Sequence, residues 1–316
     1  MRTALSGLAL LLLASCATAP PPGPPVPSVD YHQHLISPAF ATVLNVTTLR
    51  DGEALVRELD AAGIHRAVVL SVGYSFADER KGLSDPDART RAENDWTSAQ
   101  VAGSHGRLIG FCSANPLRAA ALQELERCLA LPGMTGIKQH WGNAGVSLRN
   151  PEHLRNTQRL FAFAERRRVP VLVHMRARGG QDYGAQDARL FLEQVVPLAP
   201  HIEIVVAHLG ASGPGYTPQH DEVMAVFGEA AERRAPAMRN IYFDVSSNVV
   251  PETTADEAAA VARRVRQVGP RRILYGSDLN AAGGSIGRAW EIFRTKVPLS
   301  DREFRAIAGN RTRFAR

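Results

Sequence analysis

The sequence predicts an α/β protein with one (β/α)8 TIM barrel domain. Eight short, apolar, β-branched runs alternate with segments of helical spacing, and residues of metal-ligand type stand at the ends of five of these runs. A doubly wound open sheet would show the same alternation, but it gives no reason for ligand-type residues at so many strand ends. In a barrel these ends surround one mouth, where active sites of this fold lie. The predicted strands are 29–34, 66–72, 108–112, 135–138, 169–174, 202–207, 241–245 and 272–275.

The amino-terminal residues 1–15 have the features of an export signal. Their apolar run, from about Leu5 to Leu13, is too short to span a bilayer as a helix. The motif Leu-Ala-Ser-Cys ending at Cys16 resembles the lipobox of bacterial lipoproteins, which implies cleavage before Cys16 and its lipidation. Because Ala17 follows the cysteine, the resemblance implies the periplasmic side of the outer membrane in a Gram-negative cell. The alternative is a soluble secreted protein with ordinary cleavage near Ala19.

Residues 16–28 form a proline-rich linker, which favours an extended polyproline conformation of about 3.1 Å per residue. Residues 29–316 contain no second low-complexity stretch, and 45% of the whole chain is hydrophobic. This length and composition predict one domain of catalytic size.

The composition also excludes several functions. The net charge of +6 comes from dispersed arginines without interleaved aromatic residues, so nucleic acid is not an expected partner. The absence of Gly-x-Ser-x-Gly, Walker and dinucleotide motifs argues against serine-nucleophile, nucleotide and hydride chemistry. The expected partner is a small-molecule substrate; the oligomeric state is not predicted.

Two features remain open between alternatives. Cys112 and Cys128 are an even pair in an oxidising compartment, so they form either a disulfide or two buried thiols. The long connection 73–87 is either a lid over the mouth or a mobile loop.

His65, His105 and His201 precede strands and are assigned to structure.

The ligand-type residues predict a divalent metal site. His32 and His34 are two apart on the first strand, so both side chains point into the barrel and can share one ion with His174, His208 and Asp278. Imidazole and carboxylate ligands suit Zn²⁺, and Mn²⁺, Fe²⁺ or Co²⁺ would fit the same set. Such an ion lowers the pKa of bound water toward about 7.

At this point the chain resembles the amidohydrolase superfamily, specifically the amidohydrolase-related group that includes aminocarboxymuconate semialdehyde decarboxylase. The resemblance extends from Val29 to Phe314 and includes Gly-Ile-Lys-Gln-His at 136–140 and Asn-Arg-Thr at 310–312. It implies that His32, His34, His174 and Asp278 bind the metal, with Asp278 also taking a proton from water. It implies that His208 is either a further ligand or the general acid/base.

The resemblance leaves Lys138 with two roles. A carboxylated lysine bridges two ions in two-metal members, whereas in one-metal members it contacts substrate or pairs with an acid. The one-ion arrangement is favoured. His140 is expected to contact substrate or Lys138, or to be a wall residue. Arg176 and Arg178 are candidates for binding a substrate carboxylate, and Asn280 for a substrate contact, although ordinary loop positions explain all three.

Three functions therefore compete. The first is a metal-dependent hydrolase acting on an amide, lactone or ester-type small molecule. The second is a non-oxidative decarboxylase or hydratase of a carboxylated substrate on the same scaffold. The third is a lipid-anchored metal-binding or solute-binding protein without turnover, which the intact general-base candidates disfavour.

Overall fold

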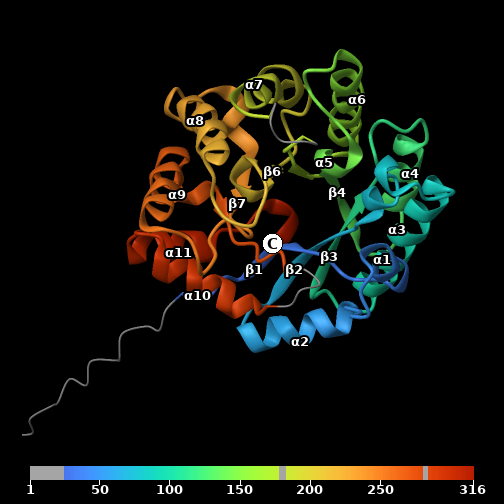
Figure 1. Ribbon diagram of the computed structural model, residues 1–316, viewed down its shortest axis with the longest axis horizontal. Helices are drawn as coiled ribbons and strands as arrows, with labels where there is room; N and C mark the ends of the chain where they lie inside the picture. Colours follow the sequence, from blue (N-terminus) through green and yellow to red (C-terminus); the bar gives the residue numbers. More distant parts are fainter. Residues whose placement is uncertain (1–24, 178–182, 280–283) are drawn as a thin grey trace, which may run out of the picture.

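The computed structural model describes residues 25–177, 183–279 and 284–316 and contains a closed parallel barrel (Figure 1). Its strands are paired in sequence order, from β1 to β8. The backbone N–H of Tyr31 donates to the carbonyl of Tyr275 at 2.8 Å, and that of Asp278 donates to His32 at 2.9 Å, which closes the sheet between its first and last strands. The predicted fold is confirmed. The strands are β1 (Val29–Gln33), β2 (Arg66–Leu70), β3 (Leu108–Ser113), β4 (Met134–His140), β5 (Val171–His174), β6 (Ile204–Val206), β7 (Ile241–Asp244) and β8 (Ile273–Leu274).

Helices surround the barrel and cover the outer face of its sheet (Figure 1). Most begin with a side-chain cap: Asp51 accepts a hydrogen bond at the start of α2, and Asn150 does so at the start of α6. The α-helices are α1 (Pro38–Leu44), α2 (Gly52–Ala62), α3 (Pro86–Ala102), α4 (Ala121–Leu129), α5 (Trp141–Ala144), α6 (Pro151–Arg167), α7 (Ala185–Leu190), α8 (Pro218–Glu232), α9 (Ala255–Val268), α10 (Ile286–Lys296) and α11 (Asp301–Gly309).

The core has two parts because successive strand residues face opposite sides of the sheet. Val68 and Leu70 of β2 face the barrel interior, whereas Ala67 and Val69 face the helices. At the amino-terminal end of the strands the interior is filled by packed rings, with Phe314 5.3 Å from Phe111 and 6.0 Å from Tyr31. Among the described residues, this packing fills the amino-terminal end of the barrel, so we expect a substrate at the opposite end.

The structure decides the question of the two cysteines: Cys112 of β3 and Cys128 of α4 form a disulfide with their Cα atoms 6.0 Å apart. The connection after β2 contains two short 3-10 helices, Gly73–Ser75 and Glu79–Lys81, and its Tyr74 and Phe76 are buried.

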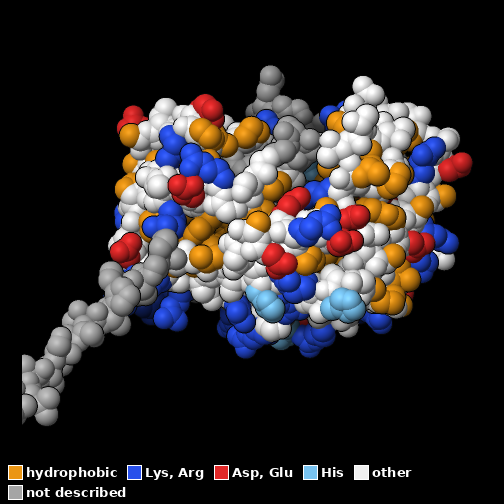
Figure 2. All heavy atoms as spheres, turned by 90° about the horizontal axis from the view of Figure 1, so that it is seen from below, with side chains coloured by type: hydrophobic (Ala, Val, Ile, Leu, Met, Phe, Trp, Pro, Cys, Tyr) orange, Lys and Arg blue, Asp and Glu red, His pale blue; other side chains and the backbone are white. Residues whose placement is uncertain are grey.

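Within the described part of the chain, no helix has the length and apolarity needed to cross a bilayer. Figure 2 shows a surface on which hydrophobic, basic and acidic side chains are interspersed, with basic side chains along its lower margin.

Glu93 of α3 is a buried acid, and its carboxylate accepts a hydrogen bond of 2.6 Å from Ser37. Burial raises the pKa of Glu93 to about 7. Because this pKa exceeds that of an exposed glutamate, the folded protein binds the Glu93 proton more tightly than the unfolded chain does. The stability that the protonated carboxyl contributes is present below about pH 4.5 and is lost as the pH rises through 7.

When the pH is raised from 5 to 8, we therefore expect the free energy of unfolding of the wild type to fall by about 2 kcal/mol relative to that of Glu93→Gln. Urea denaturation at both pH values measures this difference. Glu232→Gln, at an exposed position, is the control and should show no such change. Parallel pH dependence of wild type and Glu93→Gln would contradict the prediction.

Candidate active site

Five histidines form a continuous row of rings at the carboxyl ends of the strands. His32 of β1 lies 5.3 Å from His34 and 4.7 Å from His208, measured between ring centroids. His208 lies 4.8 Å from His174 of β5, which stacks on His140 of β4 at 3.9 Å. The barrel thus brings together the histidines that the sequence predicts at strand ends.

Three of these histidines face Asp278. The Nε2 atoms of His32 and His34 each lie 3.8 Å from Asp278 Oδ1, and Nε2 of His208 lies 3.8 Å from Oδ2. Three ring nitrogens, one from β1 and two from the residues just after β1 and β6, therefore converge on the carboxylate that follows β8.

The other ring nitrogen of each histidine is fixed by an oxygen acceptor. Nδ1 of His32 donates to a carboxylate oxygen of Asp244 at 2.9 Å, that of His34 donates to the Leu70 carbonyl at 2.8 Å, and that of His208 donates to the Ser246 carbonyl at 2.9 Å. With the proton on Nδ1, each Nε2 presents its lone pair to the site. This tautomer is the one that a metal ligand requires.

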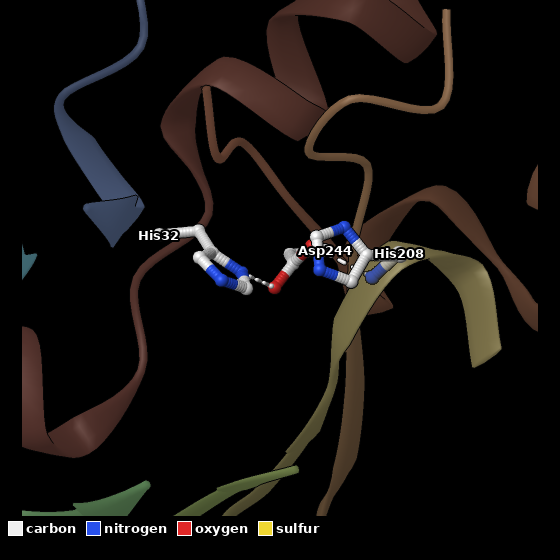
Figure 3. A group of neighbouring side chains, drawn as sticks. All are labelled: His32, His208 and Asp244. Carbon is white, nitrogen blue, oxygen red and sulfur yellow. Dashed lines mark hydrogen bonds and ion pairs between the residues drawn. The ribbon is translucent and has the colours of Figure 1, made fainter. Parts of the chain in front are cut away.

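Asp244, which ends β7, is the residue that the sequence prediction missed (Figure 3). One carboxylate oxygen accepts from His32, and the other accepts from the backbone N–H groups of His208 and Ser246 and from the Ser246 hydroxyl. Burial alone would raise the pKa of Asp244, but the interaction with His32 and the other hydrogen bonds hold it below its usual range. The available signal was an apolar run, Ile241 to Phe243, that ends in an acid.

Asp244 also lies in a compact group with His32 and His208. Both of its oxygens already accept hydrogen bonds, and the Nδ1 of His32 that approaches it carries a proton. We therefore interpret Asp244 as a positioning residue and not as a metal ligand.

The backbone at the site is held in strained conformations. His208 and Asp278 both have positive φ, 53° and 48°, a conformation that costs a residue with a Cβ about 1 to 2 kcal/mol. Hydrogen bonds from the N–H of His208 to Asp244 and from Asn248 Nδ2 to the His208 carbonyl hold the first of these in place. At Gly276 a Cβ would lie only 2.7 Å from that of His32, so glycine allows β8 to approach β1 here.

Lys138 is fully buried beneath the histidines, and its Nζ lies 3.3 Å from Nε2 of His32. Burial lowers the pKa of Lys138 to about 8, although Asp278 and Asp244 act in the opposite direction. The amine thus contacts the same nitrogen that would bind an ion.

His140 differs from the other histidines in its tautomer. The backbone N–H of Asn143 donates to Nδ1 of His140 at 3.2 Å, so Nδ1 carries the lone pair and the ring proton lies on Nε2. A metal ligand through Nε2 would need the opposite tautomer, which would place two N–H groups against each other. His140 is therefore a hydrogen-bond donor through Nε2.

Burial is the largest cause that lowers the pKa of His34, His140 and His174 well below the usual range, with nearby positive charges adding to it. These rings are neutral at neutral pH.

The donor set fits a divalent metal ion. His32, His34 and Asp278 each offer one ligand atom, and these atoms all lie within 4.8 Å of one another. Ligand atoms about 2.1 Å from a tetrahedral ion are about 3.4 Å apart, so the observed 3.8 Å separations need only small shifts. Among the described residues, His174 is outside both compact groups of potential ligands, and its role as a ligand stays a prediction.

The remaining predicted residues are placed as follows. Arg176, after β5, donates to the side-chain carbonyl of Gln219 at 3.1 Å. Arg178, Asn280 and Cys16 lie outside the described residues. His65, His105 and His201 are exposed at the opposite end of the barrel, in agreement with their assignment to structure.

A mostly apolar cavity of about 270 Å³ adjoins Asp278 on the side of β7 and β8. It extends between the segments after these strands and α10. Its apolar walls include Val245, Val249, Val250, Leu279, Ile292 and Phe293.

Comparison with known proteins identifies the class. The model of the amidohydrolase family matches residues 29–310, so the chain belongs to this family. Members of the family are metal-dependent hydrolases and decarboxylases, and the protein is accordingly an enzyme. No curated protein matches the sequence.

Solved structures share the fold at low identity. A putative amidohydrolase from Staphylococcus aureus is 15% identical with a TM-score of 0.58, covering 90% of this chain and 97% of its own. A 2,6-dihydroxybenzoate decarboxylase is 17% identical with a TM-score of 0.57, covering 89% and 96%. A probable 2-pyrone-4,6-dicarboxylic acid hydrolase from Acinetobacter baumannii is 14% identical with a TM-score of 0.56, covering 89% and 95%.

Asp244→Asn tests the positioning of His32. The amide oxygen would keep the backbone donors of His208 and Ser246, so the NH2 group would face Nδ1 of His32 and move the ring proton to Nε2. We expect metal affinity to fall about 10- to 100-fold, measured by titration of the metal-free protein. Asp256→Asn, an exposed acid on α9, is the control. Unchanged affinity in Asp244→Asn would contradict this role.

Proposed function

We propose that the protein is a metal-dependent hydrolase that cleaves an amide, lactone or ester-type small molecule. The observation that supports this most is the convergence of three Nε2 atoms on Asp278, each with its Nδ1 proton held by an oxygen. His32, His34 and Asp278 would hold the ion, with His174 as a further predicted ligand. One shared group of ligand atoms favours one ion over two. Zn²⁺ suits these ligands, as would Mn²⁺, Fe²⁺ or Co²⁺.

The bound ion would supply a water of lowered pKa and polarise the substrate carbonyl. Asp278 accepts the proton of the attacking water, because its carboxylate lies at the centre of the site and is only partly exposed. His208, whose Nε2 lies 3.8 Å from Asp278, would carry that proton to the leaving group. Lys138 holds positive charge beneath His32 and would move away from Nε2 when an ion binds.

The two sides of Asp278 suggest the kind of substrate. On one side the apolar cavity would accept a hydrocarbon or aromatic portion. On the other, Nε2–H of His140 would donate to a polar oxygen of the substrate, with Tyr74 packed 4.7 Å from its ring. A small molecule with an apolar body and a polar group fits both sides.

Decarboxylation of a carboxylated substrate is the second candidate, because Arg176 lies just beyond His174 and a solved relative in fold is a decarboxylase. The guanidinium of Arg176 already donates to Gln219, and the cavity beside Asp278 is mainly apolar. These contacts favour hydrolysis. Product analysis of a panel of esters, lactones, amides and carboxylated aromatics separates the candidates, since only decarboxylation releases carbon dioxide.

We also propose that Cys16 is lipidated and anchors the enzyme in the cell envelope, on the periplasmic side of the outer membrane in a Gram-negative cell. The support is the lipobox-like Leu-Ala-Ser-Cys motif after a short apolar run and before a proline-rich segment.

Asp278→Asn should lower kcat by about 10²- to 10⁴-fold, because the amide cannot accept the proton of the attacking water. The histidines remain, so most of the metal should remain bound. Steady-state kinetics and elemental mass spectrometry measure both effects. Glu252→Gln changes an exposed acid after β7 and should retain activity. Wild-type turnover in Asp278→Asn would remove Asp278 from the mechanism.

His140→Phe should keep the ring stack on His174 but remove the Nε2 donor. We expect kcat/KM to fall about tenfold or more, mainly through KM, with unchanged metal content. His153→Phe is a matched control, because its Nδ1 accepts a backbone N–H from Ser147 in the same way at 3.2 Å. Loss of metal in His140→Phe alone would show instead that His140 supports the metal site directly.

A further inference from the structure

The charge of this enzyme is distributed unequally between the two ends of its barrel. We define the strand-start face as the segments that lead into the strands together with the segment after α11: 25–28, 63–65, 103–107, 130–133, 168–170, 199–203, 233–240, 269–272 and 310–316. They carry ten arginines, no lysine and one acidic side chain, Glu203, which is buried. The arginines are Arg107, Arg168, Arg233, Arg234, Arg239, Arg271, Arg272, Arg311, Arg313 and Arg316.

The opposite end of the barrel is balanced. The described segments that follow the strands contain six basic and six acidic side chains, so they have no net charge. The basic residues are Arg50, Arg80, Lys81, Arg118, Arg149 and Arg176, and the acidic ones are Asp51, Asp78, Glu79, Asp85, Glu252 and Asp278. Among the described segments that connect helices and strands, the positive charge is therefore concentrated on the strand-start face.

Helix ends explain part of this pattern, since cations stabilise the carboxyl ends of helices. Four of the ten arginines form ion pairs: Arg107 with Asp60 of α2, Arg168 with Glu165 of α6, Arg233 with Glu229 of α8 and Arg313 with Glu203. The connecting segments themselves contain no acid other than Glu203. Within the described residues, Arg234, Arg239 and Arg271 are exposed and make no ion pair. The exposed histidines 65, 105 and 201 belong to the same face.

The chain reaches the barrel at this same face. Ser28 precedes β1, and its N–H donates to the Ala308 carbonyl at 3.1 Å, while Arg311 donates to the Ser28 hydroxyl at 3.2 Å. The Pro25 carbonyl accepts from Trp290 at 2.8 Å. Cys16 lies nine residues before Pro25, which is at most about 32 Å along an extended chain.

From this charge distribution and this point of attachment we propose that the strand-start face lies against an anionic lipid surface. The inference rests on the proposed lipid anchor for its orientation, but the charge of the face stands without it. Clustered arginines are attracted to anionic headgroups within about one Debye length, roughly 8 Å at physiological salt. An anchor at Cys16 would hold the face close enough for this attraction.

Nucleic acid is the other polyanion that such a face could attract. Single-stranded nucleic acid is bound by exposed aromatic rings among the cations. In the described strand-start segments the one aromatic residue is Phe314, and its ring packs on Tyr31 and Phe111. The face thus offers charge without stacking surfaces, as a lipid headgroup layer requires.

Docking on this face would orient the enzyme. The active site lies at the other end of the barrel, so its mouth would point away from the bilayer toward soluble substrates. Because the described mouth segments have no net charge, that end of the barrel would not compete for the same lipid surface.

A fluorescence experiment on the lipidated protein tests the proposal. With Cys112 and Cys128 in a disulfide and Cys16 lipidated, His65→Cys provides a single labelling site on the strand-start face, and Glu252→Cys provides one at the mouth. The protein is placed on vesicles of phosphatidylcholine alone or with one quarter phosphatidylglycerol, each containing a nitroxide-labelled lipid. We expect at least threefold more quenching at position 65 with phosphatidylglycerol, reversed by 0.5 M salt, and little change at position 252.

The arginine variants identify the surface. Arg234→Gln, Arg239→Gln and Arg271→Gln together should abolish the increase at position 65. The matched control replaces Arg155, Arg159 and Arg189 of α6 and α7, which are also exposed and without ion pairs among the described residues, and it should keep the increase. Equal quenching on both lipids, equal loss in both triple variants, or protection by duplex DNA without a response to phosphatidylglycerol would overturn the proposal.

This design tests the proposed lipid anchor and the proposed binding of the strand-start face to anionic lipid separately. Flotation with neutral phosphatidylcholine vesicles reports the acyl chains alone, and it should be lost in Cys16→Ser. Addition of the protein, with or without lipid on Cys16, to preformed anionic vesicles measures binding through the strand-start face. A salt-sensitive response to phosphatidylglycerol without flotation on neutral vesicles would remove the anchor and support the face.

Discussion

Closure of the parallel sheet between β1 and the segment after β8 is the constraint on which the site depends. It brings His32 and Asp278, 246 positions apart in the chain, into one hydrogen-bonded backbone contact of 2.9 Å. Because every strand runs in the same direction, the residues that follow each strand must share one rim. An open sheet with the same strands would leave β1 and β8 at opposite edges, and the three imidazoles could not face one carboxylate.

Hydrogen bonds to Nδ1 then divide the histidines by function. His32, His34 and His208 donate from Nδ1 to oxygen acceptors and present a lone pair at Nε2, whereas His140 accepts at Nδ1 and presents a proton. Histidines in the same row of rings can therefore act either as metal ligands, through a lone pair on Nε2, or as hydrogen-bond donors, through a proton on Nε2. The difference arises from backbone groups and from Asp244, none of which contacts a substrate. Positioning residues therefore determine what the ring atoms in the mouth can do.

The sequence was sufficient for the fold and for most of the residues that form the rim, because strand ends are marked by the change from β-branched to polar residues. Residues 241–245 were predicted as a strand, yet Asp244 was missed, because a lone acid at a strand end has no partner that the sequence identifies. The tautomer of His140 was equally out of reach, since it depends on the turn into α5 that directs the N–H of Asn143 at its ring. The disulfide stayed open for a similar reason, because the packing of α4 on β3 sets the 6.0 Å Cα separation.

The two ends of the barrel obey different constraints, and this explains why their charges differ. At the mouth, the buried amine of Lys138 already lies 3.3 Å from Nε2 of His32, and a surplus of further cations nearby would disfavour binding of a metal cation. The strand-start face is closed by Phe314, Tyr31 and Phe111, so no substrate passes there and its charge does not act directly on the chemistry. Positive charge can accumulate on that face with little effect on the active site, because the barrel separates it from the predicted metal ligands. A catalytic mouth and a docking face can therefore coexist in one small domain, since the fold places them at opposite ends of the same strands.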